Sequence, residues 1–400
     1  MKKLLLPLLP VALLAKSFLV SEVPLPQTYI ENLDPYVCDE VCLKEYLDNG
    51  QVFSFLAYSD TKNLLDPELS SARTMHMALF HMNASFTNNG SDIKIAMILP
   101  TKRIGKYAAS TMNAAFAYLM TKHNPFELKS YSIASENAQD VQNALQQAQD
   151  DGFNYIIAPM TPQGIQNLID QNPSAQIYVP TLQKDRFVNA PSQFIFGGIN
   201  YKKQIDALLE YASAPLVIFS DKSSVGKRLA QYQQERFFDT ADSKRVKKYF
   251  IGRKTTNLAP YLKYNRGVVG GTFFINTPIV KTSMILSQLT LYDTYPQHVL
   301  STQINYNPLL LTMTQYTDRK NLLIANSLTV QNDDVLESND IVNNNIAYDW
   351  INYSTTVGVD YFFSLITGDE RVYDIPMDDN QMLYDVKIVK PLYHSFSTVN

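Results

Sequence analysis

Short apolar runs alternate with amphipathic segments along the chain from residue 93 onward. Each apolar run has the length of a buried strand, and the segments between runs place apolar side chains at helical spacing. The predicted strands are 93–100, 126–134, 154–159, 176–180, 193–200, 215–220, 246–251, 268–276, 298–305, 321–327 and 381–389. The predicted helices are 104–122, 138–150, the polar segment between the third and fourth strands, 201–212, 225–238, 278–291 and 344–366.

Strand–helix alternation this regular predicts an α/β protein with parallel sheets and helices on both faces. The chain has 400 residues, which exceeds the size of one compact core. We therefore predict two lobes with a cleft between them, joined by a chain that crosses more than once. Lobe I is predicted to hold 91–198 and 321–368, and lobe II 199–320 and 369–400. The strand at 193–200 is predicted to leave the first sheet.

Residues 18–90 show helical patterning without a convincing strand. Asp34 and Pro35 form an N-cap and first-turn pair, which predicts a helix over 34–48. A longer helix is predicted over 66–86, with Met75, Leu79 and Met82 on one face. This region is too short for a core of its own. We expect a helical extension that docks on the rest of the chain or on a partner.

The N-terminal residues have the pattern of a secretory signal peptide. Lys2 and Lys3 precede an apolar stretch, and Ala15 and Ser17 are spaced as a cleavage site. We predict a signal peptide over 1–17, a mature chain that starts near Phe18, and a periplasmic location. The later apolar runs are too short or too charged to span a bilayer, so no membrane span is expected after cleavage.

The two cysteines, Cys38 and Cys42, are four residues apart. On a helix this spacing places both side chains on one face, and export to an oxidising compartment favours a disulfide between them. The alternative is a pair of small core residues. Two thiols are too few for a closed zinc site, and a redox motif would need the C-x-x-C spacing.

Composition and charge exclude several classes of function. The formal charge of −4 and a pI near 5.8 provide no basic field for nucleic acid. The 14 glycines are few for a phosphate-binding loop. Ser224 and Lys227 match S-x-x-K, but the S-D-N and K-T-G partners are missing. The five histidines are scattered, so we predict neither a metal, nor a cofactor, nor an enzyme.

From Ile93 onward the chain resembles the type I periplasmic binding proteins, and most closely the binding-protein-like domain of the LpoA-like activators of penicillin-binding proteins. The first lobe contributes IAMILPTKRIGKYA, ALQQAQDDGFNYIIAPMTPQGI and NYSTTVGVDYFFSL to this resemblance. The crossing and the second lobe contribute QFIFGGINYKKQIDALLEYA and FSDKSSVGKRLAQYQQERF, and TGDERVYDIPMDDNQMLYDVKIVKP is similar to the closing hairpin. The likeness covers about three quarters of the chain and implies the two-lobed fold.

The resemblance also implies where a ligand would lie. Family members hold a ligand carboxylate at first-lobe strand ends with a hydroxyl and free N–H groups. Here those positions are Thr161 and Thr181, although Thr161 before a proline is equally a helix N-cap. The second lobe and the hinge offer further candidates, Ser220, Asp221, Thr272 and Tyr201.

One departure from the family pattern affects the ligand. The turn after the first strand is TKRIG, with bulky Lys102 and Arg103 where family members place small residues that approach a ligand. Two hypotheses follow. The first is a non-catalytic cell-envelope accessory that uses the binding-protein fold as a platform for another protein. The second is a receptor for a small amino-acid-like ligand that feeds a transporter or a sensor.

Overall fold

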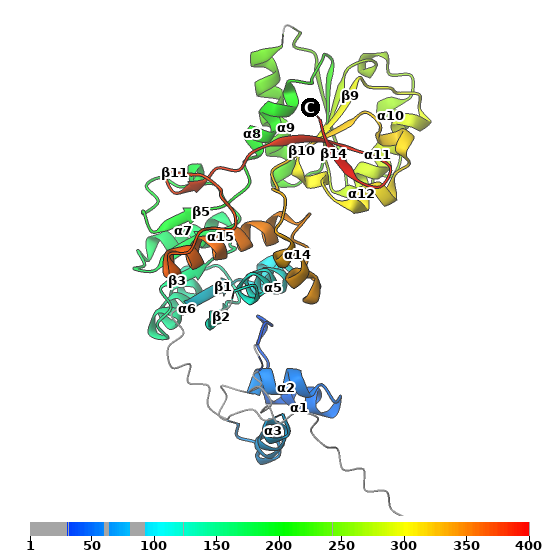
Figure 1. Ribbon diagram of the computed structural model, residues 1–400. Coiled ribbons are helices and arrows are strands. Elements are labelled where there is room, and N and C mark those ends of the chain that lie inside the picture. The colour runs from blue at the N-terminus through cyan, green and yellow to red at the C-terminus, as the bar shows by residue number, and fades with distance from the viewer. Residues whose placement is uncertain are drawn as a thin grey trace, which may run out of the picture. The chain divides into compact units, whose positions relative to one another are not determined.

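The computed structural model describes residue 30 and residues 32–59, 64–80, 93–122, 124–241 and 243–399 (Figure 1). The predicted signal peptide lies outside these residues, as do Met82 and the end of the predicted helix over 66–86. The described chain divides into two compact units. A helical unit contains the described residues before position 88 except 33–37, and an α/β unit contains 33–37 and the rest.

The α/β unit holds two sheets of seven strands each, which confirms the predicted two-lobed α/β fold. The first sheet has the order β11-β12-β5-β4-β3-β1-β2, and six of its strands are parallel. Its strands are β1 (Ile93–Leu99), β2 (Phe126–Ser132), β3 (Tyr155–Ile157), β4 (Gln176–Val179), β5 (Phe194–Phe196), β11 (Met377–Asp378) and β12 (Gln381–Met382).

Helices cover both faces of the first sheet. One face packs against α5 (Tyr107–Met120), α14 (Asp333–Ile341) and α15 (Trp350–Thr367), and short α4 (Thr101–Ile104) precedes them. The other face packs against α6 (Ala138–Asp150) and α7 (Pro162–Asp170). Buried apolar residues from both sides of the sheet explain why its strands read as continuous apolar runs.

The second sheet has the order β14-β13-β10-β9-β8-β6-β7. Its strands are β6 (Leu216–Ser220), β7 (Val246–Phe250), β8 (Thr272–Asn276), β9 (His298–Ser301), β10 (Leu322–Asn326), β13 (Lys387–Pro391) and β14 (Phe396–Thr398). One face packs on α8 (Tyr201–Leu209) and α9 (Ser224–Thr240). The other packs on α10 (Ala259–Leu262), α11 (Ile279–Leu291) and α12 (Pro308–Met313), with α13 (Tyr316–Arg319) following.

The chain crosses between the lobes at places that differ from the expected boundaries. Strand β10 pairs with β9 and β13 in the second sheet, so lobe I receives no strand from 321–327. The β11–β12 hairpin instead joins β5 in the first sheet, and only β13 and β14, red in Figure 1, return to lobe II. Strand β5 also stays in the first sheet, paired with β4. Periodicity identifies a buried strand but does not specify which sheet it joins.

A buried carboxylate fixes the position of α15. Asp360 is fully buried and accepts hydrogen bonds from the Tyr118 hydroxyl at 2.7 Å and from the backbone N–H groups of Val372 and Tyr373 at 2.8 and 3.1 Å. Arg371 Nε lies 3.5 Å from Oδ2, the oxygen that accepts from Tyr373, and forms an ion pair with it. Burial, followed by the Asp360 charge, raises the pKa of the Tyr118 hydroxyl well above its usual value, so this group remains a donor. The carboxylate therefore joins α5, α15 and the chain that follows α15.

The helical unit contains α1 (Glu40–Asp48), α2 (Val52–Ser59) and α3 (Pro67–Leu79) around a small apolar cluster. Helix α1 begins six residues later than predicted. Asp39 caps it by accepting from the Cys42 N–H at 3.0 Å, whereas the Asp34 side chain accepts from the Tyr36 N–H in a local turn. Cys38 thus precedes the helix and pairs with Cys42 in a disulfide at its first turn.

No helix in the described ranges combines the length and the apolar character that crossing a bilayer requires.

We predict that Asp360→Ala lowers the free energy of unfolding by about 3 kcal/mol, because three donors and the Arg371 charge lose a buried acceptor. Asp360→Asn keeps one acceptor oxygen and is expected to fall between Asp360→Ala and wild type. Urea denaturation measures both. Asp369→Ala is the control, since Asp369 is exposed, and should change stability by less than about 0.5 kcal/mol. Equal losses in Asp360→Ala and Asp369→Ala would refute the anchoring role of Asp360.

The exported protein is expected to carry the Cys38–Cys42 disulfide. Alkylation in denaturant without reductant should leave both cysteines unmodified, and reduction first should make both reactive. Intact mass measures the outcome. Complete alkylation without reductant would show two packed thiols instead.

Candidate functional site

Thr161 and Thr181 lie at the carboxyl edge of the first sheet, as predicted for a ligand site. Thr161 follows β3 and is the N-cap residue of α7, while Thr181 follows β4. Parallel neighbouring strands bring their carboxyl ends to one edge, so the two threonines face the same region. The partners of their hydroxyls decide whether this edge can still hold a ligand.

The chain's own Glu136 occupies the donors at Thr161. One carboxylate oxygen of Glu136 accepts from the Thr161 N–H at 2.7 Å, and the other accepts a short hydrogen bond from the Thr161 hydroxyl. Glu136 lies in the loop after β2 and is only 8% exposed. Its carboxylate sits at the N-terminus of α7, where the helix dipole favours an anion. Glu136 therefore takes the place that the family resemblance assigns to a ligand carboxylate.

Two neighbouring residues, Asn167 and Gly164, accommodate Glu136. Asn167 Nδ2 donates to the Glu136 backbone carbonyl at 2.6 Å. Gly164 lies on the first turn of α7, and a Cβ there would lie 2.9 Å from Glu136 Cδ, closer than real Cβ contacts. The absence of a side chain at Gly164 leaves the space that the carboxylate fills. The Thr161 side chain makes no capping bond of its own, so the N-cap interpretation is wrong for its hydroxyl.

The other first-lobe and hinge candidates also have internal roles. The Thr181 hydroxyl donates to the Met160 carbonyl at 2.7 Å. Tyr201 is the first residue of α8, at the first crossing between the lobes, and packs against the lobe II core. Burial raises the pKa of the Tyr201 hydroxyl to about 12, with a smaller rise from Tyr107 and an opposing effect of Arg228.

The lobe II candidates separate into two groups. Ser220 ends β6 and is buried, and Asp221 follows it and accepts from the N–H and hydroxyl of Ser223 at 3.1 and 2.5 Å. Thr272, in contrast, is the first residue of β8, so it lies at the amino edge of the sheet. Its hydroxyl accepts from the Ser213 N–H at 2.8 Å. The expectation that Thr272 lines the cleft is wrong, because the double glycine before it leads into the strand instead of ending one.

Sequence reasoning missed a set of polar residues at the carboxyl edge of the second sheet. Four parallel strands end in a buried polar residue, namely Ser220, Asn276, Ser301 and Asn326. The signal was visible, since each apolar run ends in Ser or Asn. The side chains of Asn276, Ser301 and Asn326 form hydrogen bonds with other residues of the protein.

The hydrogen bonds along this edge join strand ends to α9, to a neighbouring strand and to the short turn at 303–305. Asn276 exchanges two amide hydrogen bonds with Gln233 of α9, at 2.7 and 2.9 Å. The Ser301 hydroxyl donates to the Ile275 carbonyl at 2.8 Å, and Asn326 accepts from Gln303 at 3.0 Å. Two buried oxygens nearby, Thr302 Oγ1 and Asn305 Oδ1, have no protein partner among the described residues.

A small open hollow remains beside Glu136. Its volume is about 300 Å³. Its lining residues are Lys102, Arg103, Ala134, Ser135, Glu136, Asn137 and Gln163. Lys102 and Arg103 belong to α4, because the TKRIG turn forms a short helix, and both are exposed. Neither makes an ion pair with another described residue. The Gly105 carbonyl that ends this turn accepts from the Tyr36 hydroxyl at 3.2 Å.

The residues considered for catalysis do not converge. Ser224 and Lys227 lie in the first turn of α9 without a hydrogen bond between them. Within the described ranges, no three His, Cys, Asp or Glu side chains approach closely enough to share a metal ion.

The two lobes, their sheets and the chain crossings between them define the fold class of the protein. The protein has the fold of the type I periplasmic binding proteins, as the sequence resemblance implied. The leucine-binding protein LivK of Thermotoga maritima is similar with a TM-score of 0.55 and 13% identity, over 77% of this chain and 98% of that one. LivJ of Streptococcus pneumoniae, solved with isoleucine, matches with a TM-score of 0.53 and 10% identity, over 77% and 99% of the two chains.

LpoA of Haemophilus influenzae is the particular neighbour that the sequence resemblance named. It matches with a TM-score of 0.54 and 10% identity, over 90% of this chain and 72% of that one. The 77% that LivK covers equals the share of residues 93–400 in the chain, so a match over 90% must include residues of the helical unit. No protein-family model and no curated protein matches the sequence.

We predict that Glu136→Ala lowers the free energy of unfolding by about 2 kcal/mol, because the Thr161 N–H loses its acceptor. Gly164→Ala should also destabilise by displacing the carboxylate. Gln163→Ala is the matched control. Gln163 lines the same hollow but is exposed and makes no side-chain hydrogen bond, so less than about 0.5 kcal/mol is expected. Thermal denaturation with circular dichroism measures all three, and a neutral Glu136→Ala would contradict the internal carboxylate site.

Proposed function

We propose that the protein is a non-catalytic accessory of the cell envelope, exported to the periplasm, that uses the binding-protein fold as a platform for another protein. The observation that carries this proposal is the Glu136 carboxylate on the N–H and hydroxyl of Thr161. An internal anion that holds these donors in place removes the reason for the lobes to close on a solute.

The carboxyl edge of the second sheet supports the same proposal. In a solute receptor, polar side chains at this edge would face the ligand. Here Asn276 and Asn326 bond to Gln233 and Gln303 of their own lobe. A ligand would have to displace satisfied, buried hydrogen bonds, and each displaced bond costs about 1 kcal/mol or more.

Two further features favour the accessory function and its location. The LpoA match extends into the helical unit, which the LivK and LivJ matches do not require. The charged, apolar and small-residue order of residues 1–17 supports export.

The alternative is a solute receptor, and one observation favours it. Lys102 and Arg103 bring to the hollow beside Glu136 two cations that form no ion pair with the described residues. A small amino-acid-like ligand with a carboxylate would meet these side chains at the cleft edge of lobe I.

A thermal-shift screen separates the two functions. A receptor at a hundredfold excess of ligand over Kd gains about 2.7 kcal/mol, or a rise of roughly 5 °C in Tm. We expect no shift of the wild-type protein with any of the common amino acids. Glu136→Ala vacates the donors of Thr161, so acetate should raise its Tm in a saturable manner.

A double substitution provides the control for the acetate response. Adding Thr161→Val to Glu136→Ala removes the hydroxyl donor and should abolish the acetate response. A wild-type shift with an amino acid that disappears in Thr161→Ala would establish the receptor instead. Pulldown from periplasm with the wild-type protein as bait tests the platform function, because a platform should retain another protein.

A further inference from the structure

Strand β7 is an open edge of the second sheet. It pairs only with β6, in parallel. The Arg245 carbonyl accepts from the Leu216 N–H at 2.9 Å, and the Ile251 N–H donates to the Ser220 carbonyl at 2.8 Å. Because backbone direction alternates along a strand, the N–H and C=O groups of Val246, Lys248 and Phe250 point away from β6. No hydrogen bond joins these groups to other residues in the described part of the chain.

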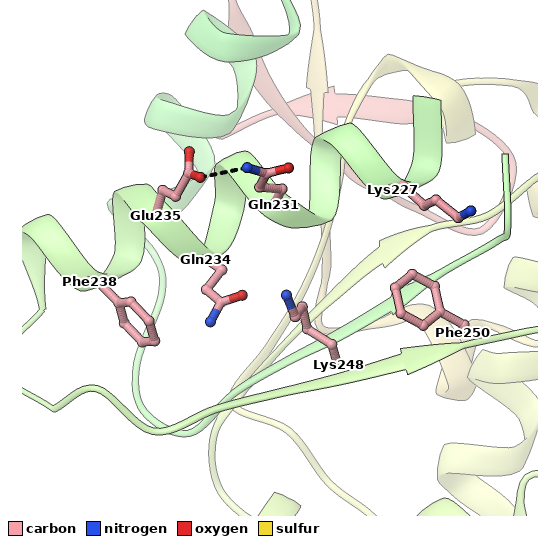
Figure 2. Close-up of a pocket in the computed structure, with 7 residues that line it drawn as sticks. All are labelled: Lys227, Gln231, Gln234, Glu235, Phe238, Lys248 and Phe250. Carbon is pink, nitrogen blue, oxygen red and sulfur yellow. Dashed lines mark hydrogen bonds between the residues drawn. The ribbon is translucent and has the colours of Figure 1, made fainter. Parts of the chain in front are cut away.

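A groove runs between this edge and α9 (Figure 2). Its volume is about 520 Å³. The residues that line this edge groove are Lys227, Gln231, Gln234, Glu235, Phe238, Lys248 and Phe250. Lys248 and Phe250 are two residues apart, so both side chains leave β7 toward α9. The Phe250 ring is 44% exposed, and Phe238 supplies a second aromatic ring from α9.

The sequence segment that contains β7 is strongly biased in charge. Residues 243–292 contain nine lysines and arginines and no acidic residue, although the whole chain has 34 basic and 38 acidic residues. Lys244 and Arg245 are exposed just before β7, and Arg253 and Lys254 just after it. No ion pair involves any of these nine residues within the described ranges.

The two lysines in the edge groove are likewise without an acidic partner among the described residues. Lys227 and Lys248 point toward the groove from opposite walls (Figure 2). Glu235, the acid among the lining residues, accepts from Gln231 at 2.8 Å on the α9 side. The groove thus combines outward backbone groups of β7, exposed aromatic surface and a net positive charge of two lysines against one glutamate.

We infer that an extended acidic segment of a protein partner binds beside β7 as an added strand, with alternate side chains in the edge groove. This inference rests on the proposed platform function and names the chemistry of its partner. The partner backbone would pair with the outward groups of Val246, Lys248 and Phe250. Its carboxylates would meet Lys227 and Lys248, and an apolar side chain would cover Phe250.

The structure favours a peptide over other anions. A lipid headgroup or a nucleic acid would meet the lysines but leave the outward N–H groups of β7 without a paired backbone. A second copy of this chain is disfavoured, because two basic edges repel each other. The surrounding cations attract an acidic segment over a longer range and raise its association rate.

The test measures binding of a fluorescein-labelled heptapeptide of alternating Glu and Val to the full chain by anisotropy. Charge reversal by Lys227→Glu or Lys248→Glu should weaken binding about threefold to tenfold each. Lys247→Glu is the matched control. Lys247 is the neighbouring residue of the same strand, but its side chain projects from the opposite face and bonds to Asn265 at 3.3 Å. It should change affinity less than either groove variant.

A second peptide separates strand addition from simple charge attraction. N-methylation of alternate amides in the same heptapeptide removes one row of donors and should abolish specific binding. Equal binding of the methylated peptide, or equal effects of Lys247→Glu and Lys248→Glu, would overturn the inference. Preferential binding to phosphatidylglycerol vesicles or to an oligonucleotide would also overturn it. These outcomes are independent of the amino-acid screen, which reports on Thr161 in the other lobe.

Discussion

The buried carboxylate of Asp360 is the contact on which the first lobe depends. A charge with no exposed surface is stable only when protein donors replace its water shell, and here the donors come from α5 and from the chain beyond α15. Lobe I is therefore complete only after the chain has passed through most of lobe II and returned. The same return delivers β12 to the edge of β5. The hydrogen bonds to Asp360 and the pairing of β12 with β5 both require the chain after α15 to lie against lobe I.

A second internal carboxylate occupies donors at the carboxyl edge of the first sheet. Glu136 stands at the N-terminus of α7, where a binding-protein fold offers N–H groups and a hydroxyl to an anion. Gly164 provides the space, and Asn167 holds the backbone of the loop. The chain itself thus supplies an anion to the N-terminus of α7. In lobe II, the Asn276–Gln233 pair satisfies strand-end groups in a similar way.

The proposed platform function draws attention to the outer surfaces of the lobes as well as to the strand ends. The edge groove of lobe II lies between α9 and β7, at the edge of the second sheet. Its basic character is hidden in the net charge of −4, because acidic residues elsewhere outweigh the nine cations of residues 243–292. A window of local charge along the sequence reveals it. Charge distribution, not total charge, determines which partners a surface attracts.

The sequence by itself determined most of the strands and the longer helices of the α/β unit, because apolar runs and helical periodicity follow directly from burial on both faces of a sheet. It did not indicate α14, and it predicted one strand over 381–389 where the structure has β12 in the first sheet and β13 in the second. It also indicated the fold class and the strand-end positions of Thr161 and Thr181. It did not determine that β10 joins the second sheet, that α1 begins after Asp39, or that Thr272 opens its strand. Those outcomes depend on which strands pair in the folded protein and on which side chain lies at the N-terminus of the helix. The partner of Thr161 was equally hidden, since Glu136 is 25 residues away in the chain and only the packing of α7 against the loop after β2 brings the two together.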